Sequence, residues 1–133
     1  MRTDYDTLVD DIAARADIGN LASAERAAIE VLLTFGELVS ADDAAALGVV
    51  LPGALGDAVT ERADPRPDLA AEGFVSLVAE REGIGVDAAD ALRHVRAVMA
   101  TVAAHGGHDE LQRARESLPE EYGPLFETAE IAG

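Results

Sequence analysis

The 133-residue sequence contains no cysteine, so disulfide bonds, thiolate nucleophiles and cysteine-ligated zinc or iron–sulfur sites are excluded. It also contains no tryptophan, and aromatic residues make up only 4% of the chain. The β-branched and aromatic runs that mark strands are correspondingly short and scattered. Alanine, the strongest helix former, supplies much of an apolar content of 49%. The composition therefore predicts an all-α fold.

Lysine is absent as well: the ten basic residues are all arginine, against 26 acidic residues. The resulting net charge of −16 destabilises a compact state by self-repulsion in ordinary buffer. In molar salt the Debye length falls to about 3 Å, and this repulsion is screened. We therefore interpret the composition as an adaptation to high salt, with a coding bias towards arginine as the alternative.

The negative charge argues against binding of nucleic acid and against docking on anionic lipid, because both need a cationic surface. No run approaches the roughly eighteen apolar residues of a membrane span. The first residues also lack the apolar stretch of a secretory signal. These observations predict a cytoplasmic protein that makes no membrane contact.

Apolar residues recur at helical spacing along most of the chain. The helices predicted for the first part cover residues 4–16, 23–39, 41–47 and a segment that begins with Pro52 in its first turn. Ser40 and Asp43 form a capping box before the third of these helices. Pro65 and Pro67 then interrupt helix formation in a connector over residues 60–68.

The pattern of the first part returns after the connector. Leu8, Val9, Ile12, Ala13, Arg15 and Ile18 have the same spacing as Phe74, Val75, Val78, Ala79, Arg81 and Ile84. A Leu-Pro pair recurs later in each part, at Leu51 and at Leu118. Generic alanine-rich amphipathicity would not reproduce both the arginine and the Leu-Pro positions, so we interpret the pattern as a twofold repeat.

The expected architecture is a helical bundle with an internal duplication, in which a Pro-containing connector joins two similar helical halves. Residues 1–59 form the first helical repeat, 60–68 the connector and 69–133 the second repeat. A chain of this length can bury roughly two-thirds of its unfolded surface. We therefore expect the two halves to form one compact unit.

These motifs resemble the haloarchaeal and bacterial family known as domain of unknown function 2267. The resemblance rests on a first helix that ends in an Ala-x-Arg-x-x-Ile turn, a long Ala/Val/Leu helix and a Leu-Pro element. In this sequence the clearest examples are residues 74–84, 91–102 and 118–122. The resemblance covers nearly the whole chain outside the connector and implies a duplicated helical bundle. It implies no activity and no functional residue.

Three histidines, His94, His105 and His108, are the candidate metal ligands. His105 and His108 have the spacing that two ligands on one helix could use. The glycines at 106 and 107 are expected to end the helix between them, so the ligand geometry is not preset. We therefore predict no metal site and no cofactor, and interpret this segment as a solvated turn.

Catalytic groups are not evident either. Adjacent acids occur at Asp10-Asp11, Asp42-Asp43 and Glu120-Glu121. Neighbouring side chains on a helix diverge by about 100°, so these pairs do not converge on one pocket. No serine lies in a Gly-x-Ser-x-Gly elbow, and no glycine-rich phosphate loop is present. We predict no catalytic residue, and a protein that is not an enzyme.

Four arginines depart locally from the acidic background: Arg93, Arg96, Arg113 and Arg115. They could contact an anion or an acidic partner through guanidinium forks, or pair with the protein's own carboxylates. A face of small residues adjoins them on the same predicted helix, at Ala97, Ala100, Ala103 and Ala104. This face could pack within the bundle or against a second subunit.

The leading hypothesis is a non-enzymatic helical interaction or regulatory protein that binds a protein partner or itself, as a homodimer. The alternative is a small-ligand or metal-binding enzyme with a site between the two halves, near His94, His105 and His108. A DNA-binding regulator that uses the four arginines is disfavoured by the overall charge. A deep polar pocket near the histidines would favour the enzyme, whereas a shallow apolar patch would favour the interaction protein.

Overall fold

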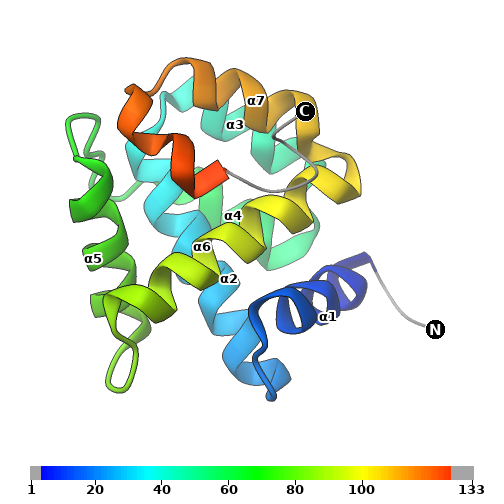
Figure 1. Cartoon of the computed structure of the whole chain (residues 1–133). Helices are drawn as coiled ribbons and strands as arrows, with labels where there is room; N and C mark the ends of the chain where they lie inside the picture. The colour runs from blue at the N-terminus through cyan, green and yellow to red at the C-terminus, as the bar shows by residue number, and fades with distance from the viewer. Residues whose placement is uncertain (1–3, 127–133) are drawn as a thin grey trace.

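Helices occupy most of residues 4–126, the part of the chain that the computed structural model describes (Figure 1). The first half contains α1 (Asp4–Ala16), α2 (Leu21–Leu38), α3 (Ala41–Val50) and α4 (Gly53–Glu61). The second half contains α5 (Ala71–Glu82), α6 (Ala88–Val102), the π-helical segment η1 (Ala103–Gly107), α7 (His108–Glu116) and the 3₁₀ helix η2 (Glu120–Phe126). No strand occurs in these residues, so the predicted all-α bundle is confirmed.

Local sequence signals determine where the helices begin. The side chains of Asn20 and Ser40 each accept a hydrogen bond, 3.1 Å long, from a backbone N–H in the first turn of α2 and α3. At α6, Asp87 and Asp90 form a reciprocal capping box. Pro52 is the N-cap of α4 rather than its first helical residue, because its backbone is still extended.

The connector is also shifted from its predicted position. Helix α4 continues to Glu61 and α5 begins at Ala71, so the segment between them covers residues 62–70. Glu37 of α2 holds this segment: its backbone carbonyl accepts from Arg66 N at 2.7 Å and its carboxylate accepts from Asp64 N at 3.0 Å. The same carboxylate pairs with Arg81 of α5 at 2.7 Å. One buried acid therefore ties the connector and α5 to α2.

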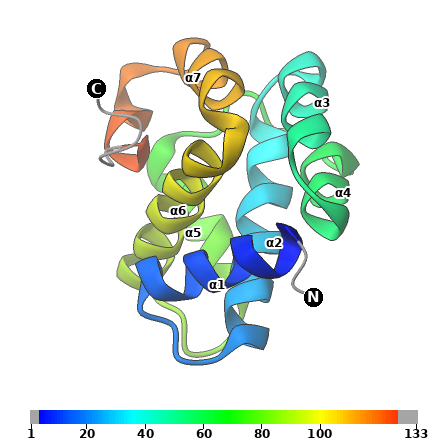
Figure 2. The same ribbon diagram turned by 90° about the vertical axis from the view of Figure 1, so that its right-hand side faces the viewer.

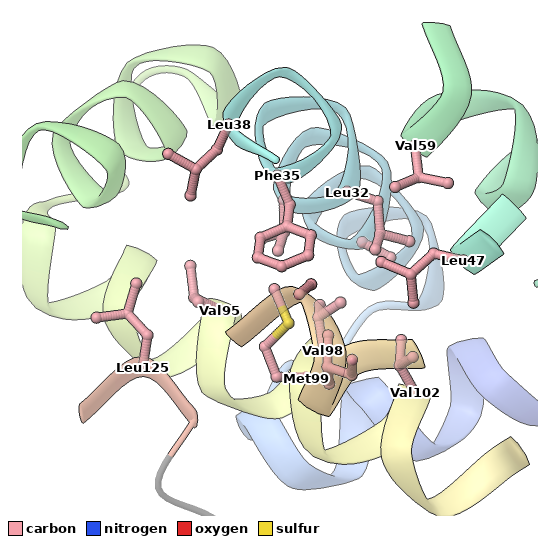
Figure 3. Packing of buried hydrophobic residues seen from close by; sticks show 14 of the residues in the cluster. Leu32, Phe35, Leu38, Leu47, Val59, Val95, Val98, Met99, Val102 and Leu125 are labelled. Atoms are coloured by element: carbon pink, nitrogen blue, oxygen red, sulfur yellow. The ribbon is translucent and has the colours of Figure 1, made fainter. Parts of the chain in front are cut away.

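The core lies between the two long helices, α2 and α6. Figure 3 shows Phe35 of α2 directed towards Met99 and Val98 of α6. The Phe35 ring makes edge-on contacts with Phe74 and Phe126, with ring centroids 6.4 and 6.0 Å apart. Such pairs add about 0.5–1.5 kcal/mol beyond the burial of their area. Four of the five aromatic residues, Phe35, Phe74, Tyr122 and Phe126, are thus concentrated where α2, α5 and η2 meet.

Each half packs its first helix on the long helix of the other half. Helix α1 contacts α6 and α5 contacts α2, while α2 contacts α6 and α3 contacts α7 (Figures 1 and 2). The turn between α1 and α2 and the turn between α5 and α6 lie at the same end of the molecule (Figure 2). Exchanging the two halves would leave this set of contacts unchanged. The internal duplication predicts this reciprocity and itself stays a prediction.

Two arginines, one on each long helix, form matching hydrogen bonds to the first helix of the other half. Arg26 of α2 donates from Nε to the carbonyl of Glu82 at 3.0 Å, at the end of α5. Arg93 of α6 donates from Nε to the carbonyl of Ala16 at 2.8 Å, at the end of α1. The last carbonyls of a helix have no partner within the helix and carry partial negative charge, so a guanidinium stabilises them.

The small-residue face of α6 lies mainly inside the molecule. Ala97, Ala100 and Ala103 are buried, and only Ala104 is exposed. Helix α1 packs against α6 within the same chain. Internal packing, the first of the two alternatives for this face, therefore accounts for its buried residues. No helix of residues 4–126 combines the length and apolar character needed to cross a bilayer.

Candidate functional site

The structure does not bring the three histidines together. His94 is buried on α6, with Nδ1 2.8 Å from a carboxylate oxygen of Glu82. His105 lies in η1, with Nε2 3.0 Å from Asp11 on α1. His108 begins α7, and its closest polar contact is with Asp109, at 3.4 Å. Within residues 4–126, no group of three histidine or acidic side chains could hold a metal ion.

The α-helix ends before Gly106 and Gly107, as expected, but through a π-helical segment that the sequence spacing did not predict. His105 and Gly106 have non-helical backbone angles, and Gly106 has a φ of 99°. Glycine adopts this conformation without steric cost. The chain therefore bends between α6 and α7 through a π-helical turn, and His105 lies exposed on it.

The four candidate arginines are directed to different elements. Arg93 contacts the end of α1 and also pairs with Asp90, at 3.1 Å. Arg96 donates from Nε to the carbonyl of Pro124 at 2.8 Å, and Arg115 lies 5.9 Å from the centre of the Phe126 ring. Arg113 is exposed on α7. Two of the four thus meet at η2, where they support the protein's own backbone and aromatic packing.

The acidic pairs are separated as well. Asp11 pairs with Arg15 at 3.1 Å, whereas Asp42 and Asp43 lie in the first turn of α3. Glu120 and Glu121 lie in the first turn of η2. Negative charge is favourable at the start of an α-helix, which accounts for the aspartates of α3. These acids are not placed to face one another across a pocket.

One apolar feature of the described surface is an open groove of about 320 Å³ over α5, the first turns of α6, and η2. Figure 1 shows these three elements around one side of the molecule. The lining residues are Ala71, Glu72 and Val75 of α5, Ala88, Ala89 and Leu92 of α6, and Pro124 and Leu125 of η2. Glu72 is the one charged residue in this lining. We call this feature the α5–α6 groove.

Three separate parts of the sequence build the groove. Val75 and Leu92 pack against the main core but keep part of their surface exposed. Segment η2 closes one side, held by the hydrogen bond from Arg96 to Pro124 and by Tyr122, whose hydroxyl donates to the carbonyl of Leu69. The sequence does not predict this site, because its lining residues come from three segments that only the fold brings together.

A second cavity, of about 380 Å³, lies between α1 and α2 and has the opposite character. Its lining residues are Tyr5, Asp6, Val9, Asp10, Leu21, Ala22 and Glu25. We call it the α1–α2 cleft. The hydroxyl of Tyr5 donates to Glu25 across it. Burial, followed by the interaction with Glu25, raises the pKa of Tyr5 to about 12.

The groove and the cleft occupy corresponding positions in the predicted repeat. The spacing that aligns Val9 with Val75 also aligns residues 5 and 6 with 71 and 72. The spacing that aligns α2 with α6 places residues 21, 22 and 25 opposite 88, 89 and 92. The same location is therefore acidic in the first half and apolar in the second.

A third cavity, of about 430 Å³, lies between α7 and η2. Arg115 and Gln112 supply hydrogen-bond donors to it, but Glu116 and Glu120 line it as well. The mixed charge does not favour an anion there. None of these three cavities is lined by a histidine.

Comparison with known proteins finds one family. The family model described as "Uncharacterized conserved protein (DUF2267)" matches residues 5–125. The match includes both halves and the connector, so it covers the α5–α6 groove and the α1–α2 cleft together. A comparison with curated proteins finds no match.

Proposed function

Because the chain belongs to the DUF2267 family of uncharacterized conserved proteins, we propose a function from its surface: a non-enzymatic helical interaction protein whose contact site is the α5–α6 groove. The groove is open and almost wholly apolar, on a molecule whose net charge is −16. An open apolar groove on a helical surface can take the apolar face of an amphipathic helix. The apolar lining of this open groove, with Glu72 as its one charged residue, is the observation on which the proposal rests.

The arrangement of polar groups supports a contact site more than a catalytic one. His94 is buried beside Glu82, while His105 and His108 are paired with carboxylates on other parts of the surface. A catalytic site needs such groups to converge on one reacting atom. The anion or partner contact of Arg93, Arg96, Arg113 and Arg115 stays a prediction.

The proposal includes the cytoplasm as the location and concentrated salt as the working condition. The 26 acidic residues, set against ten arginines and no lysine, support the second part. Screening by salt reduces the repulsion within one molecule and also between two molecules that meet. Binding experiments therefore belong in salt of about 1 M or more, where the Debye length is about 3 Å.

The test uses three fluorescent amphipathic peptides that share one leucine stripe and differ in having basic, acidic or neutral polar faces. Fluorescence anisotropy measures their binding to the wild type, to Leu92→Asp in the groove and to Val49→Asp on α3. Val49 is a suitable control because it is 85% exposed and lies outside the groove.

We expect at least one peptide to bind the wild type and Val49→Asp equally, and Leu92→Asp about tenfold more weakly, a loss of about 1.4 kcal/mol. Circular dichroism and thermal unfolding confirm that both variants fold. Equal binding by the two variants would contradict the proposal. So would the absence of both peptide binding and self-association.

A further inference from the structure

A second open groove lies between α2 and α4 and has a volume of about 440 Å³. Figure 2 shows α4 beside α2, which it contacts. The lining residues are Ile29 and Leu33 of α2, and Ala54, Asp57, Ala58, Thr60 and Glu61 of α4. None of them lines the α5–α6 groove, so the two sites are separate. We call this feature the α2–α4 groove.

The α2 side of this groove is apolar and its α4 side carries negative charge. Ile29 and Leu33 pack against the main core but keep part of their surface exposed. Asp57 and Glu61 are exposed and lie four residues apart on α4, so their side chains share one face. Neither carboxylate has a hydrogen bond or an ion pair within residues 4–126. The groove therefore offers an apolar surface beside two carboxylates that the chain itself does not neutralise.

Glu30 of α2 increases the negative charge at this place. It follows Ile29 in sequence and lies close enough to Glu61 for the two carboxylates to interact. The pKa of Glu30 is raised, chiefly by burial, and the charges of Glu82 and Glu61 raise it further. Arg26 and Arg81 lower this pKa but do not offset the other effects. A cation bound in the groove would be stabilised by these carboxylates.

The second half has a similar pair of elements. Segment η2 contacts α6 as α4 contacts α2. Both segments bury side chains at the same spacing: positions 55, 58 and 59 in α4, and 122, 125 and 126 in η2. The spacing that aligns Leu51 with Leu118 in the predicted repeat also aligns residues 29 and 57 with 96 and 124. The α2–α4 groove thus has a counterpart between α6 and η2.

An arginine of the chain itself occupies that counterpart. Arg96 of α6 donates from Nε to the carbonyl of Pro124 at 2.8 Å, so its side chain joins the long helix to η2. In the first half the aligned position on the long helix is Ile29, which cannot make this link, and the position aligned with Pro124 is Asp57. The first half therefore lacks the guanidinium and has a carboxylate in its place.

We infer that the α2–α4 groove is a second contact site, which binds arginine side chains presented by a basic helix of a protein partner. The aliphatic part of an arginine packs on Ile29 and Leu33 while its guanidinium pairs with Asp57 or Glu61. Two carboxylates four residues apart on one helix match two arginines at the same spacing on another. Partly buried ion pairs are screened less by salt than distant surface charges, so the contact persists in concentrated salt.

Methyl NMR in salt of about 1 M tests the site with an alanine-rich helical peptide that carries two arginines four residues apart. A matched peptide has citrulline in place of both arginines, which keeps the shape and removes the charge. The arginine peptide should shift the Ile29 and Leu33 signals saturably and leave Leu92 and Val75 unchanged. The citrulline peptide should bind at least about tenfold more weakly. Absence of binding, equal binding of the two peptides, or shifts confined to Leu92 and Val75 would overturn the inference.

Charge-neutralising variants test the two carboxylates. Asp57→Asn combined with Glu61→Gln should raise the Kd of the arginine peptide at least about tenfold. The control combines Asp68→Asn with Glu80→Gln, which removes the same charge from exposed positions that line neither groove. It should bind with the wild-type Kd. An equal loss in both double variants would indicate a general effect of net charge and contradict the site.

Ile29→Arg gives the first half the residue that the second half has at position 96. We expect its own arginine to fill the groove and to weaken peptide binding at least about tenfold. Circular dichroism checks that the variant folds; if it does not, the double variants decide the question. A folded Ile29→Arg that binds the peptide with the wild-type Kd would contradict the inference.

The two contact sites can be tested independently. Leu92→Asp, which disrupts the α5–α6 groove, should bind the arginine peptide with the wild-type Kd. A clear loss of binding in Leu92→Asp would place this peptide in the other groove and overturn the inference. Failure of either site leaves the other in place, because they share no lining residue.

Discussion

The α1–α2 cleft and the α5–α6 groove lie at corresponding places in the two halves, yet one is acidic and the other apolar. In the first half Tyr5 and Ile18 pack over Val9, and Glu25 accepts from the Tyr5 hydroxyl. In the second half the same positions hold Ala71, the exposed Ile84, Val75 and Leu92. The spacing of the predicted repeat aligns the two sites, and their side chains decide whether the lining is acidic or apolar.

The contacts between the halves differ in a similar way. Arg15 and Arg81 have corresponding positions, but Arg15 pairs with Asp11 on its own helix whereas Arg81 reaches buried Glu37 on α2. In the predicted repeat the equivalent of Glu37 is Ala104 in η1, which offers no carboxylate. The contact of α5 with α2 therefore includes a buried ion pair that the contact of α1 with α6 lacks.

The largest expected effect comes from Gly36→Ala on α2. A Cβ atom at this position would lie 2.0 Å from the carbonyl oxygen of Val59, where α2 and α4 meet. In the predicted repeat the corresponding residue is Ala103, at the start of η1, so the second half accommodates the methyl group. We expect a loss of about 3 kcal/mol, because backbone atoms must move.

Urea unfolding measures this loss, with Gly19→Ala as the control. An added Cβ at Gly19 meets nothing within 4 Å. If Gly36→Ala proves as stable as Gly19→Ala, the close approach of α2 and α4 is wrong.

Glu37→Ala should have the next largest effect. Its carboxylate is 3% exposed and binds Arg81 and Asp64 N. We expect a loss of about 2 kcal/mol, below the usual cost of breaking a fully buried pair, because the Arg81 side chain is 20% exposed. Asp11→Ala, which removes the more exposed pair with Arg15, should cost at most about 1 kcal/mol. Equal losses in chemical unfolding would contradict the contrast between the two arginines.

Arg26→Ala and Arg93→Ala test the reciprocal contacts. Each removes a guanidinium from the last carbonyls of the other half's first helix. We expect each variant to lose about 1 kcal/mol, since both sites are partly open to solvent. Thermal unfolding should give similar shifts for the two. A normal stability for one and a clear loss for the other would show that the halves are not equivalent here.

The smallest effect concerns alkaline pH. Tyr5 and Tyr122 each have a pKa raised from 10.0 to about 12, chiefly by burial. Between these values the folded state keeps a proton that the unfolded chain releases, so the stabilisation is full below pH 10 and is lost as pH rises through about 12. Tyr5→Phe should make the free energy of unfolding fall less steeply over this range. An unchanged slope would place Tyr5 in solvent.

The helices could be predicted because their signals are local. The apolar spacing of Leu8 and Ile12 and the cap at Ser40 depend only on neighbours along the chain. The π-helical turn after α6 was missed because one extra residue per turn does not change which residue types are present. Pro52 was placed one residue too far into its helix because proline suits both the N-cap region and the first turn.

The groove could not be predicted from the sequence. The spacing aligned Ile84 with Ile18, but the positive φ angles of Gly83 and Gly85 direct the turn outward. Leu92 belongs to the apolar pattern of α6, and only the placement of α5 and η2 leaves part of it uncovered. The hydrogen bond from Arg93 to the carbonyl of Ala16 could not be predicted either, because it joins residues 77 positions apart in the sequence.

The most direct test of the central claim compares the exposure of the two sites by methyl NMR with a soluble paramagnetic probe in about 1 M salt. The account predicts that the probe strongly attenuates the Leu92 and Val75 signals, while Val9 stays protected. Attenuation of Leu92 and Val75 as weak as that of Val9 would contradict it.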